Sequence, residues 1–182
     1  KVLIFAARTP CEFFGLLPKV LGKKSPVTHF LGRYNFTDLE ISCSKTKAKI
    51  KEGLFSGWDD IRLPFIAALR KRGFKPGAFE NMALQRGISE VDKVLTQEDY
   101  FNLLSHFNKE VIGKDFTRAI FEEQKKKDKS SVGILMPDAK VVYGKSDLKV
   151  SKLKDKEIVY LAGIGYCCFN KREKIPFWFA HK

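Results

Sequence analysis

Residues 41–73 read ISCSKTKAKIKEGLFSGWDDIRLPFIAALRKRG, and they place three features in a fixed order. A serine and lysine cluster over 42–45 comes first, a turn over 57–64 follows, and a basic segment over 63–73 comes last. Proline suits the first turn of a helix, and glycine commonly ends one. The pattern predicts a polar loop, a brief helix over 47–53, a turn, and then a short cationic helix.

Two neighbouring carboxylates, Asp59 and Asp60, stand ahead of the basic segment. They could serve as metal ligands or as an acid and base pair. However, residues adjacent in sequence seldom converge on one site, and no His or Cys accompanies these two. Acidic side chains before a helix stabilise its exposed amide groups. We therefore favour a helix cap or an ion pair over catalysis.

The composition indicates a folded, strongly basic protein. The chain has 182 residues, 44% of them hydrophobic, and 34 Lys plus Arg against 21 Asp plus Glu, which gives a formal charge of +13. A surplus of this size favours a polyanionic partner such as nucleic acid. The alternative is a solvated lysine-rich surface of the kind that thermophile proteins carry.

The four cysteines, Cys11, Cys43, Cys167 and Cys168, contain no C-x-x-C pair, and the chain has three His. We expect no zinc site, and we expect Cys167 and Cys168 to be buried thiols in a strand. No apolar run approaches a membrane span and no signal peptide is visible, so we expect a cytoplasmic protein without a membrane partner. The chain starts without Met, and we expect the front of a longer protein to precede it.

The regions on either side of 41–73 differ in kind. Apolar runs over 1–7 and 27–34 predict two strands around a helix over 11–21, as at the end of an α/β nucleotide-binding domain. After 73, helical patterns over 76–86 and from Thr96 onward predict two helices, the second with a Thr96 and Asp99 capping box.

The last third of the chain predicts short strands. Residues 122–131 are charged and serine-rich, which is typical of a linker. Five strand-like runs with closely spaced turns then indicate a small barrel or part of one. They span 132–136, 140–143, 157–161, 165–169 and 175–180.

Several of these segments resemble the archaeal-type glutamyl-tRNA synthetases. Ser42, Ser44 and Lys45 match the family's Ile-Ser-Thr-Ser-Lys form of a catalytic loop. Residues 57–64 match its Gly-Trp-Asp-Asp-Pro-Arg-Leu-Pro block, with Ile61 in place of the first proline. Near the C-terminus, the Leu-Met-Pro-Asp turn at 135–138 and the closing strand at 177–182 also match.

The resemblance implies a fold in three parts. These are an α/β remnant of a class I Rossmann-type catalytic domain over 1–55, an α-helical junction that contacts the tRNA stem over 56–121, and an antiparallel β-barrel over 132–182 that binds the anticodon. Residues 122–131 would link the last two. The family's His-Ile-Gly-His motif, which grips ATP, occurs nowhere in the sequence.

The resemblance also implies an activity and its residues. The family joins glutamate to tRNA, using ATP and Mg²⁺, and Lys45 would stabilise the departing pyrophosphate with help from Ser42 and Ser44. A lysine and hydroxyls suit this role because phosphoryl chemistry depends on positioning and electrostatics. Arg8 is the charged residue left where the family holds its substrate.

Further residues are implied to contact tRNA. Arg62, Arg70, Lys71 and Arg72 would bind its phosphates, and barrel aromatics would stack on anticodon bases. The candidate aromatics are Tyr143, Tyr160 and Tyr166.

Alternatives remain open at this point. The chain could be a non-catalytic tRNA-binding module, either one half of a split enzyme that needs a separate N-terminal half or a decayed paralogue. Lys45 could belong to an ordinary polar loop. The motifs do not separate glutamate from glutamine.

Overall fold

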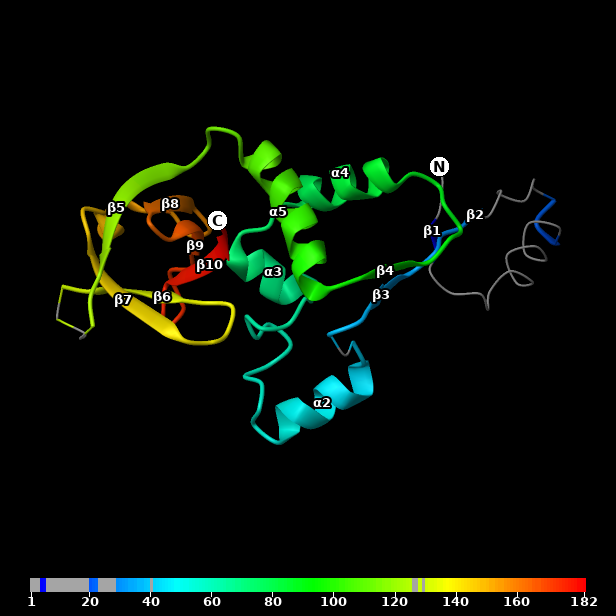
Figure 1. Ribbon diagram of the computed structural model, residues 1–182, viewed down its shortest axis with the longest axis horizontal. Coiled ribbons are helices and arrows are strands. Elements are labelled where there is room, and N and C mark those ends of the chain that lie inside the picture. Colours follow the sequence, from blue (N-terminus) through cyan, green and yellow to red (C-terminus); the bar gives the residue numbers. More distant parts are fainter. Residues whose placement is uncertain (1–3, 6–19, 23–28, 40, 126–127, 129) are drawn as a thin grey trace.

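The computed structural model describes residues 4–5, 20–22, 29–39, 41–125, 128 and 130–182. Figure 1 shows a barrel at the left, a group of helices beside it, a separate helix below the middle, and thin strand pairs toward the right. The helix predicted over 11–21 falls almost wholly outside the described residues, and so does Arg8. No helix in the part of the chain that the structure describes is long and apolar enough to cross a membrane.

Two short parallel strand pairs lie at the N-terminal end. Strand β1 (Ile4–Phe5) pairs with β2 (His29–Phe30), and these strands fall within the two predicted strand regions. Strand β3 (Tyr34–Phe36) pairs with β4 (Lys93–Leu95), which the sequence did not predict. Both pairs join segments far apart in the chain.

Helix α2 (Cys43–Lys51) corrects the prediction of a polar loop over 42–45 followed by a brief helix over 47–53. The Ser42 side chain accepts a hydrogen bond from the Lys45 amide at 3.4 Å and caps the helix. Serine is among the preferred N-cap residues. The serine and lysine cluster therefore forms the first turn of a helix.

Helix α3 (Ile66–Arg72) begins later than expected, and neither Asp59 nor Asp60 caps it. Phe65 occupies the N-cap position without a side-chain hydrogen bond, so the capping interpretation of the two aspartates is wrong. Gly73 ends the helix as predicted, in the left-handed conformation with φ 94°.

Helices α4 (Pro76–Arg86) and α5 (Gln97–Ile112) confirm the predicted pair. Thr96 and Asp99 form the predicted capping box, in which the Asp99 amide donates to the Thr96 hydroxyl at 3.1 Å. With α3, these helices enclose a small core. It consists of Leu69, Phe74, Ala78, Met82, Leu104 and Phe107.

In the described part of the chain, six strands close into a barrel in the order β10-β6-β7-β5-β8-β9. The strands are β5 (Thr117–Glu123), β6 (Val132–Leu135), β7 (Val141–Ser146), β8 (Ile158–Ala162), β9 (Gly165–Phe169) and β10 (Phe177–His181). A single turn of 3₁₀ helix, η1 (Val150–Lys152), precedes β8. The buried barrel core includes Ile134, Val159, Leu161 and Phe177.

Two features of the barrel correct the predictions, and a third confirms one. Strand β5 starts at Thr117, inside the span assigned to the helical junction, and it runs into the span assigned to a linker. The barrel is also mixed, because β5 pairs with β8 and β10 pairs with β6 in parallel. The expected buried thiols are confirmed, since Cys167 and Cys168 are 0% and 1% exposed.

Candidate nucleotide and nucleic-acid site

The turn over 57–64 is built around the Asp60 carboxylate, whose side chain is 5% exposed. Ser56 donates to it from its amide at 2.9 Å and from its hydroxyl at 3.1 Å. Arg62 donates from its amide, Nε and Nη2 at 3.1, 2.8 and 2.7 Å. Arg62 Nη2 also donates to the Leu54 carbonyl at 2.6 Å. The ion-pair interpretation of this aspartate is therefore confirmed.

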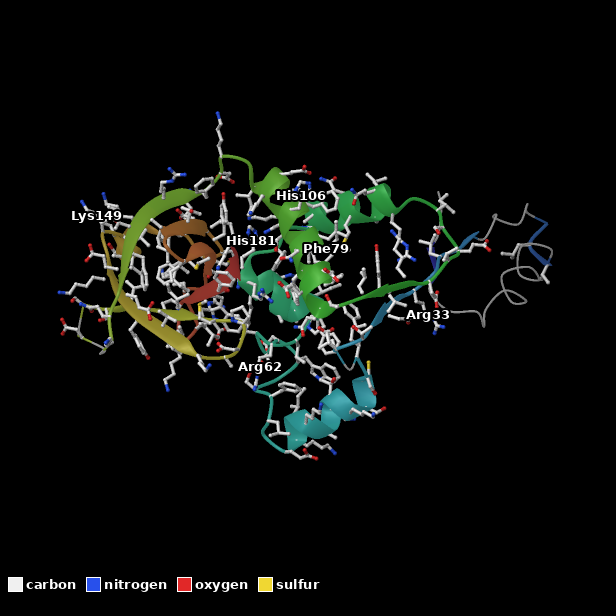
Figure 2. The ribbon with its side chains drawn as sticks, in the orientation of Figure 1. Arg33, Arg62, Phe79, His106, Lys149 and His181 are labelled. Carbon is white, nitrogen blue, oxygen red and sulfur yellow. The ribbon has the colours of Figure 1, made fainter. Side chains whose placement is uncertain are left out.

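These contacts set the charge state of the turn. Burial alone would raise the pKa of Asp60, but the hydrogen bonds from Arg62 and Ser56 outweigh it and hold that pKa well below 3.8. The Asp60 contact in turn raises the pKa of Arg62. The turn lies between α2 and α3 in the chain, and Figure 2 shows Arg62 on this connecting segment.

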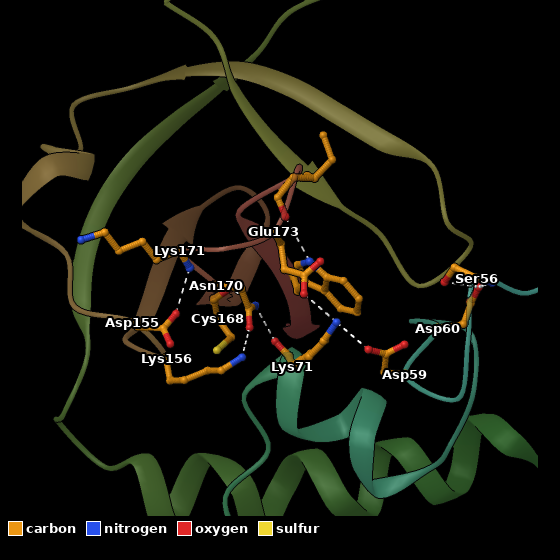
Figure 3. Close-up of polar contacts among 12 residues, drawn as sticks. Ser56, Asp59, Asp60, Lys71, Asp155, Lys156, Cys168, Asn170, Lys171 and Glu173 are labelled. Carbon is orange, nitrogen blue, oxygen red and sulfur yellow. Dashed lines mark hydrogen bonds and ion pairs between the residues drawn. The ribbon is translucent and has the colours of Figure 1, made fainter.

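Lys71 joins this turn to the barrel (Figure 3). Its ammonium lies 2.6 Å from an oxygen of Asp59 and 2.6 Å from an oxygen of Glu173, and 5.1 Å from the centroid of the Trp178 ring. The Asn170 amide group donates to the Lys71 carbonyl at 2.8 Å. Burial opposes the charge on Lys71, but its two carboxylate partners raise its pKa overall. The sequence pointed to Lys71 as a phosphate contact and missed this joint.

Arg72, which the resemblance implied as a tRNA phosphate contact, does not lie on the exposed face of α3. Its side chain is buried, and it donates from Nε to the Phe179 carbonyl at 3.1 Å and from Nη2 to the Ala180 carbonyl at 2.8 Å. The helix packs against β9 and β10, so its last turn faces the barrel. Arg72 is therefore not available to RNA phosphates on the exposed surface of α3.

The remaining predicted residues are distributed over two regions. Arg70 is exposed on α3, and Arg62 and Lys71 are partly exposed in the ion pairs above. Lys45 and Ser44 are exposed in the first turn of α2. The structure thus brings the three basic residues near the barrel joint together and leaves the α2 cluster as a separate group.

Two of the three candidate aromatics lie together. Tyr160 on β8 and Tyr166 on β9 have ring centroids 5.0 Å apart, and Phe116 lies 6.1 and 5.3 Å from them. The Arg118 guanidinium lies 5.3 Å from the Tyr160 ring centroid. Tyr143 belongs to β7, which β5 separates from β8 in the barrel.

A buried histidine that the sequence did not single out sits where α5 meets β10. His181 is 4% exposed, and its Nε2 lies 2.9 Å from the Asn108 side-chain nitrogen, while its Nδ1 lies 3.2 Å from the Lys182 carbonyl (Figure 2). Since Asn108 can only donate there, the neutral tautomer with a proton on Nδ1 satisfies both contacts. Burial is the main cause that lowers the pKa of His181 to about 4.

This histidine predicts a loss of stability in mild acid. The unfolded chain binds a proton near pH 6.5 and the folded chain only near pH 4, so stability is full above pH 6.5 and falls as the pH drops toward 4. Between pH 7 and pH 5 we expect a loss of about 2 kcal/mol from this group. Urea unfolding at the two pH values measures it.

The control substitutions separate His181 from other titrating groups. His181→Gln keeps an acceptor for Asn108 but cannot titrate, so most of the loss should disappear. The variant His106→Gln, at an exposed site on α5, should still lose stability between pH 7 and pH 5 as the parent chain does. An unchanged pH dependence in His181→Gln would contradict the assignment.

Comparison with known proteins defines the class. Residues 5–114 match the family described as "tRNA synthetases class I (E and Q), catalytic domain". The match covers more than half of the chain and includes both the α2 cluster and the 57–64 turn. The chain therefore belongs to this family of class I aminoacyl-tRNA synthetases.

Individual relatives narrow the resemblance. A glutamate–tRNA ligase of Methanocaldococcus jannaschii is 38% identical over 109 residues, which are 60% of this chain and 19% of the relative. One from Nitrosopumilus maritimus is 29% identical over 156 residues, which are 84% of this chain and 26% of the relative. One from Thermococcus kodakarensis is 35% identical over 100 residues, which are 55% of this chain and 17% of the relative. The resemblance to archaeal-type enzymes is confirmed, and the chain spans about a quarter or less of these relatives.

Proposed function

We propose that this chain is the later part of a glutamate–tRNA ligase. In that reaction the glutamate carboxylate attacks the α-phosphorus of ATP and pyrophosphate leaves. A terminal hydroxyl of the tRNA then attacks the activated carbonyl and AMP leaves. The observation that supports this best is the family match over 5–114, because it includes the two segments with the most specific motifs.

Within this proposal, the first turn of α2 acts on the phosphates. The Lys45 ammonium supplies positive charge, and the Ser42 and Ser44 hydroxyls lie beside it in the sequence. The N-terminal end of a helix carries a partial positive charge that favours phosphate. This arrangement suits stabilisation of the pyrophosphate that leaves.

Magnesium belongs to the proposed reaction as a counter-ion of the ATP phosphates. Among the described residues, no three or more His, Cys, Asp or Glu side chains gather to hold a metal ion. We therefore assign no residue of this chain to magnesium and derive no step from it.

The remaining parts have roles in the same proposal. Strands β1 and β2 belong to the remnant of a Rossmann-type domain, and α3 to α5 form the junction that contacts the tRNA stem. Arg70 and Lys71 contact tRNA phosphates from α3, and Arg62 contacts them from the 57–64 turn. Tyr160 and Tyr166, whose rings lie together on β8 and β9, stack on unpaired bases in this proposal.

Pyrophosphate exchange tests the catalytic assignment. The chain is assayed with ATP and glutamate, alone and together with a separately supplied N-terminal half taken from an archaeal relative. Exchange restored only by the mixture, and lost in Lys45→Ala, supports a split or truncated ligase. No pyrophosphate exchange in either assay, together with intact tRNA binding, would instead indicate a non-catalytic tRNA-binding module. Glutamine in place of glutamate tests the amino-acid choice.

The tRNA contact has its own prediction. Arg70→Ala should weaken tRNA binding and lower the slope of log affinity against log salt by about one, because one phosphate contact is lost. Filter binding or fluorescence anisotropy at several salt concentrations measures the slope. Lys93→Ala removes the same charge from β4 and should leave the slope unchanged. If both variants behave like the parent chain, Arg70 does not contact tRNA.

A further inference from the structure

A pocket of about 480 Å³ opens between α3, α5, strand β10 and the turn that joins β6 to β7. Its size falls within the range of small-molecule sites. Its walls include Arg72 from α3, Asn102 and Ser105 from α5, Pro137 from the turn and Phe179 from β10. None of these residues except Arg72 entered the functional predictions.

Arg72 is the unusual group in this wall, since it is a buried cation with neutral partners. Besides the carbonyls of β10, its guanidinium carbon lies 4.6 Å from the Phe101 ring centroid and 5.4 Å from that of Phe74. Among the described residues, no carboxylate forms an ion pair with it. Buried charges are normally paired, because an uncompensated one is costly.

The chemistry of the wall favours an anion. Burial lowers the pKa of Arg72 to about 10, which leaves it charged at neutral pH. Asn102 and Ser105 lie three positions apart on α5 and so share one face of the helix, where they offer amide and hydroxyl donors.

Other charged groups at the pocket nearly cancel. Arg62 lines it but is already paired with Asp60, and Glu98 and Lys182 contribute opposite charges. The uncompensated charge is therefore that of Arg72.

We propose that this pocket binds a phosphate group, carried by the RNA backbone or by a free nucleotide. The inference rests on the proposed function only for the identity of the RNA. An anion completes the pairing of Arg72 without displacing its bonds to β10, because two of its five N–H donors account for those bonds. Charge-assisted hydrogen bonds of this kind are short and strong.

A matched pair of isosteric substitutions tests the site. Asn102→Asp places a negative charge in the pocket, and Gln85→Glu makes the same change at an exposed position on α4 that does not line it. Binding of inorganic phosphate and of AMP to the full chain is followed by calorimetry, with circular dichroism as the check on folding. We expect Asn102→Asp to weaken binding by about tenfold, since Asn102 lines the pocket and the new charge would lie close to the bound anion. Gln85→Glu should change it by less than about twofold.

Competition with tRNA identifies the source of the phosphate. If tRNA displaces phosphate and Asn102→Asp also weakens tRNA binding, the group belongs to the RNA backbone. If AMP binds and tRNA does not compete, it belongs to a free nucleotide.

Two results would overturn the site. One is the absence of saturable phosphate and AMP binding together with unchanged tRNA affinity in Asn102→Asp. The other is equal weakening in both variants. Neither result would contradict the proposed ligase function, because the salt slope of Arg70→Ala and the pyrophosphate exchange assay test that function independently.

Discussion

Replacing Asp60 by alanine should lower the free energy of unfolding by about 3–5 kcal/mol, the cost typical of removing one partner from a buried ion pair. The carboxylate accepts five hydrogen bonds from Ser56 and Arg62. Its loss leaves the Ser56 amide and the Arg62 guanidinium without their acceptor in a part-buried region of the turn. Urea unfolding at pH 7 measures the change.

The neighbouring aspartate provides the control. Asp59 is 40% exposed and pairs with Lys71, so Asp59→Ala should cost no more than about 1 kcal/mol. The pH dependence has a defined sign. Because the folded pKa of Asp60 is lowered, its contribution is present above pH 3.8 and is lost as the pH falls below that value. Equal costs for the two substitutions would show that burial of Asp60 does not determine its contribution.

The local structure around this turn was largely predictable from the sequence. Pro76 and the pair Thr96 and Asp99 mark the starts of α4 and α5, and both helices form at the expected residues. Gly73 ends α3 where expected, although that helix begins later than predicted. The start of α2 was placed too late because Ser42 was interpreted as part of a catalytic loop. Its N-cap preference was the signal that could have corrected this.

The barrel was predictable in its strands and less so in its closure. Strand β9 occurs at the expected residues, but β5 was divided between a helical region and a linker. The segment TRAIFEE buries Ala119 and Phe121 on alternate positions among charged neighbours, a short period-two pattern that overall charge obscured. Parallel pairing of β5 with β8 depends on tertiary arrangement, which no local pattern specifies.

Long-range contacts were the part that could not be predicted. Lys71 and Glu173 are 102 positions apart and Arg72 bonds to β10 across 107 and 108 positions, and nothing in the local sequence selects these partners. Three adjacent basic residues on a short helix look alike in sequence. Packing against the barrel gives each a different environment: exposed, bridged, and buried.

The end of this same helix carries the last prediction, Gly73→Ala, which should destabilise the chain by about 3 kcal/mol. Gly73 has φ +94°, which an L side chain rarely adopts, and an added Cβ would lie 2.6 Å from Ile158 Cδ1 and 2.9 Å from Cys168 Cβ. Both strain and overlap therefore act at the joint between α3 and the barrel. Urea unfolding at pH 7 measures their sum.

Two comparisons separate strain from overlap. Gly53 has φ +78° with nothing within 4 Å of the added Cβ, so Gly53→Ala should show only the conformational cost, about 1 kcal/mol. Ile158→Val removes the nearest atom, Cδ1, and in combination with Gly73→Ala it should recover about 1 kcal/mol relative to the sum of the single changes. Strict additivity would mean that the barrel does not press on Gly73. In that case, close packing of α3 against strands β8 and β9 would not determine the position of the helix.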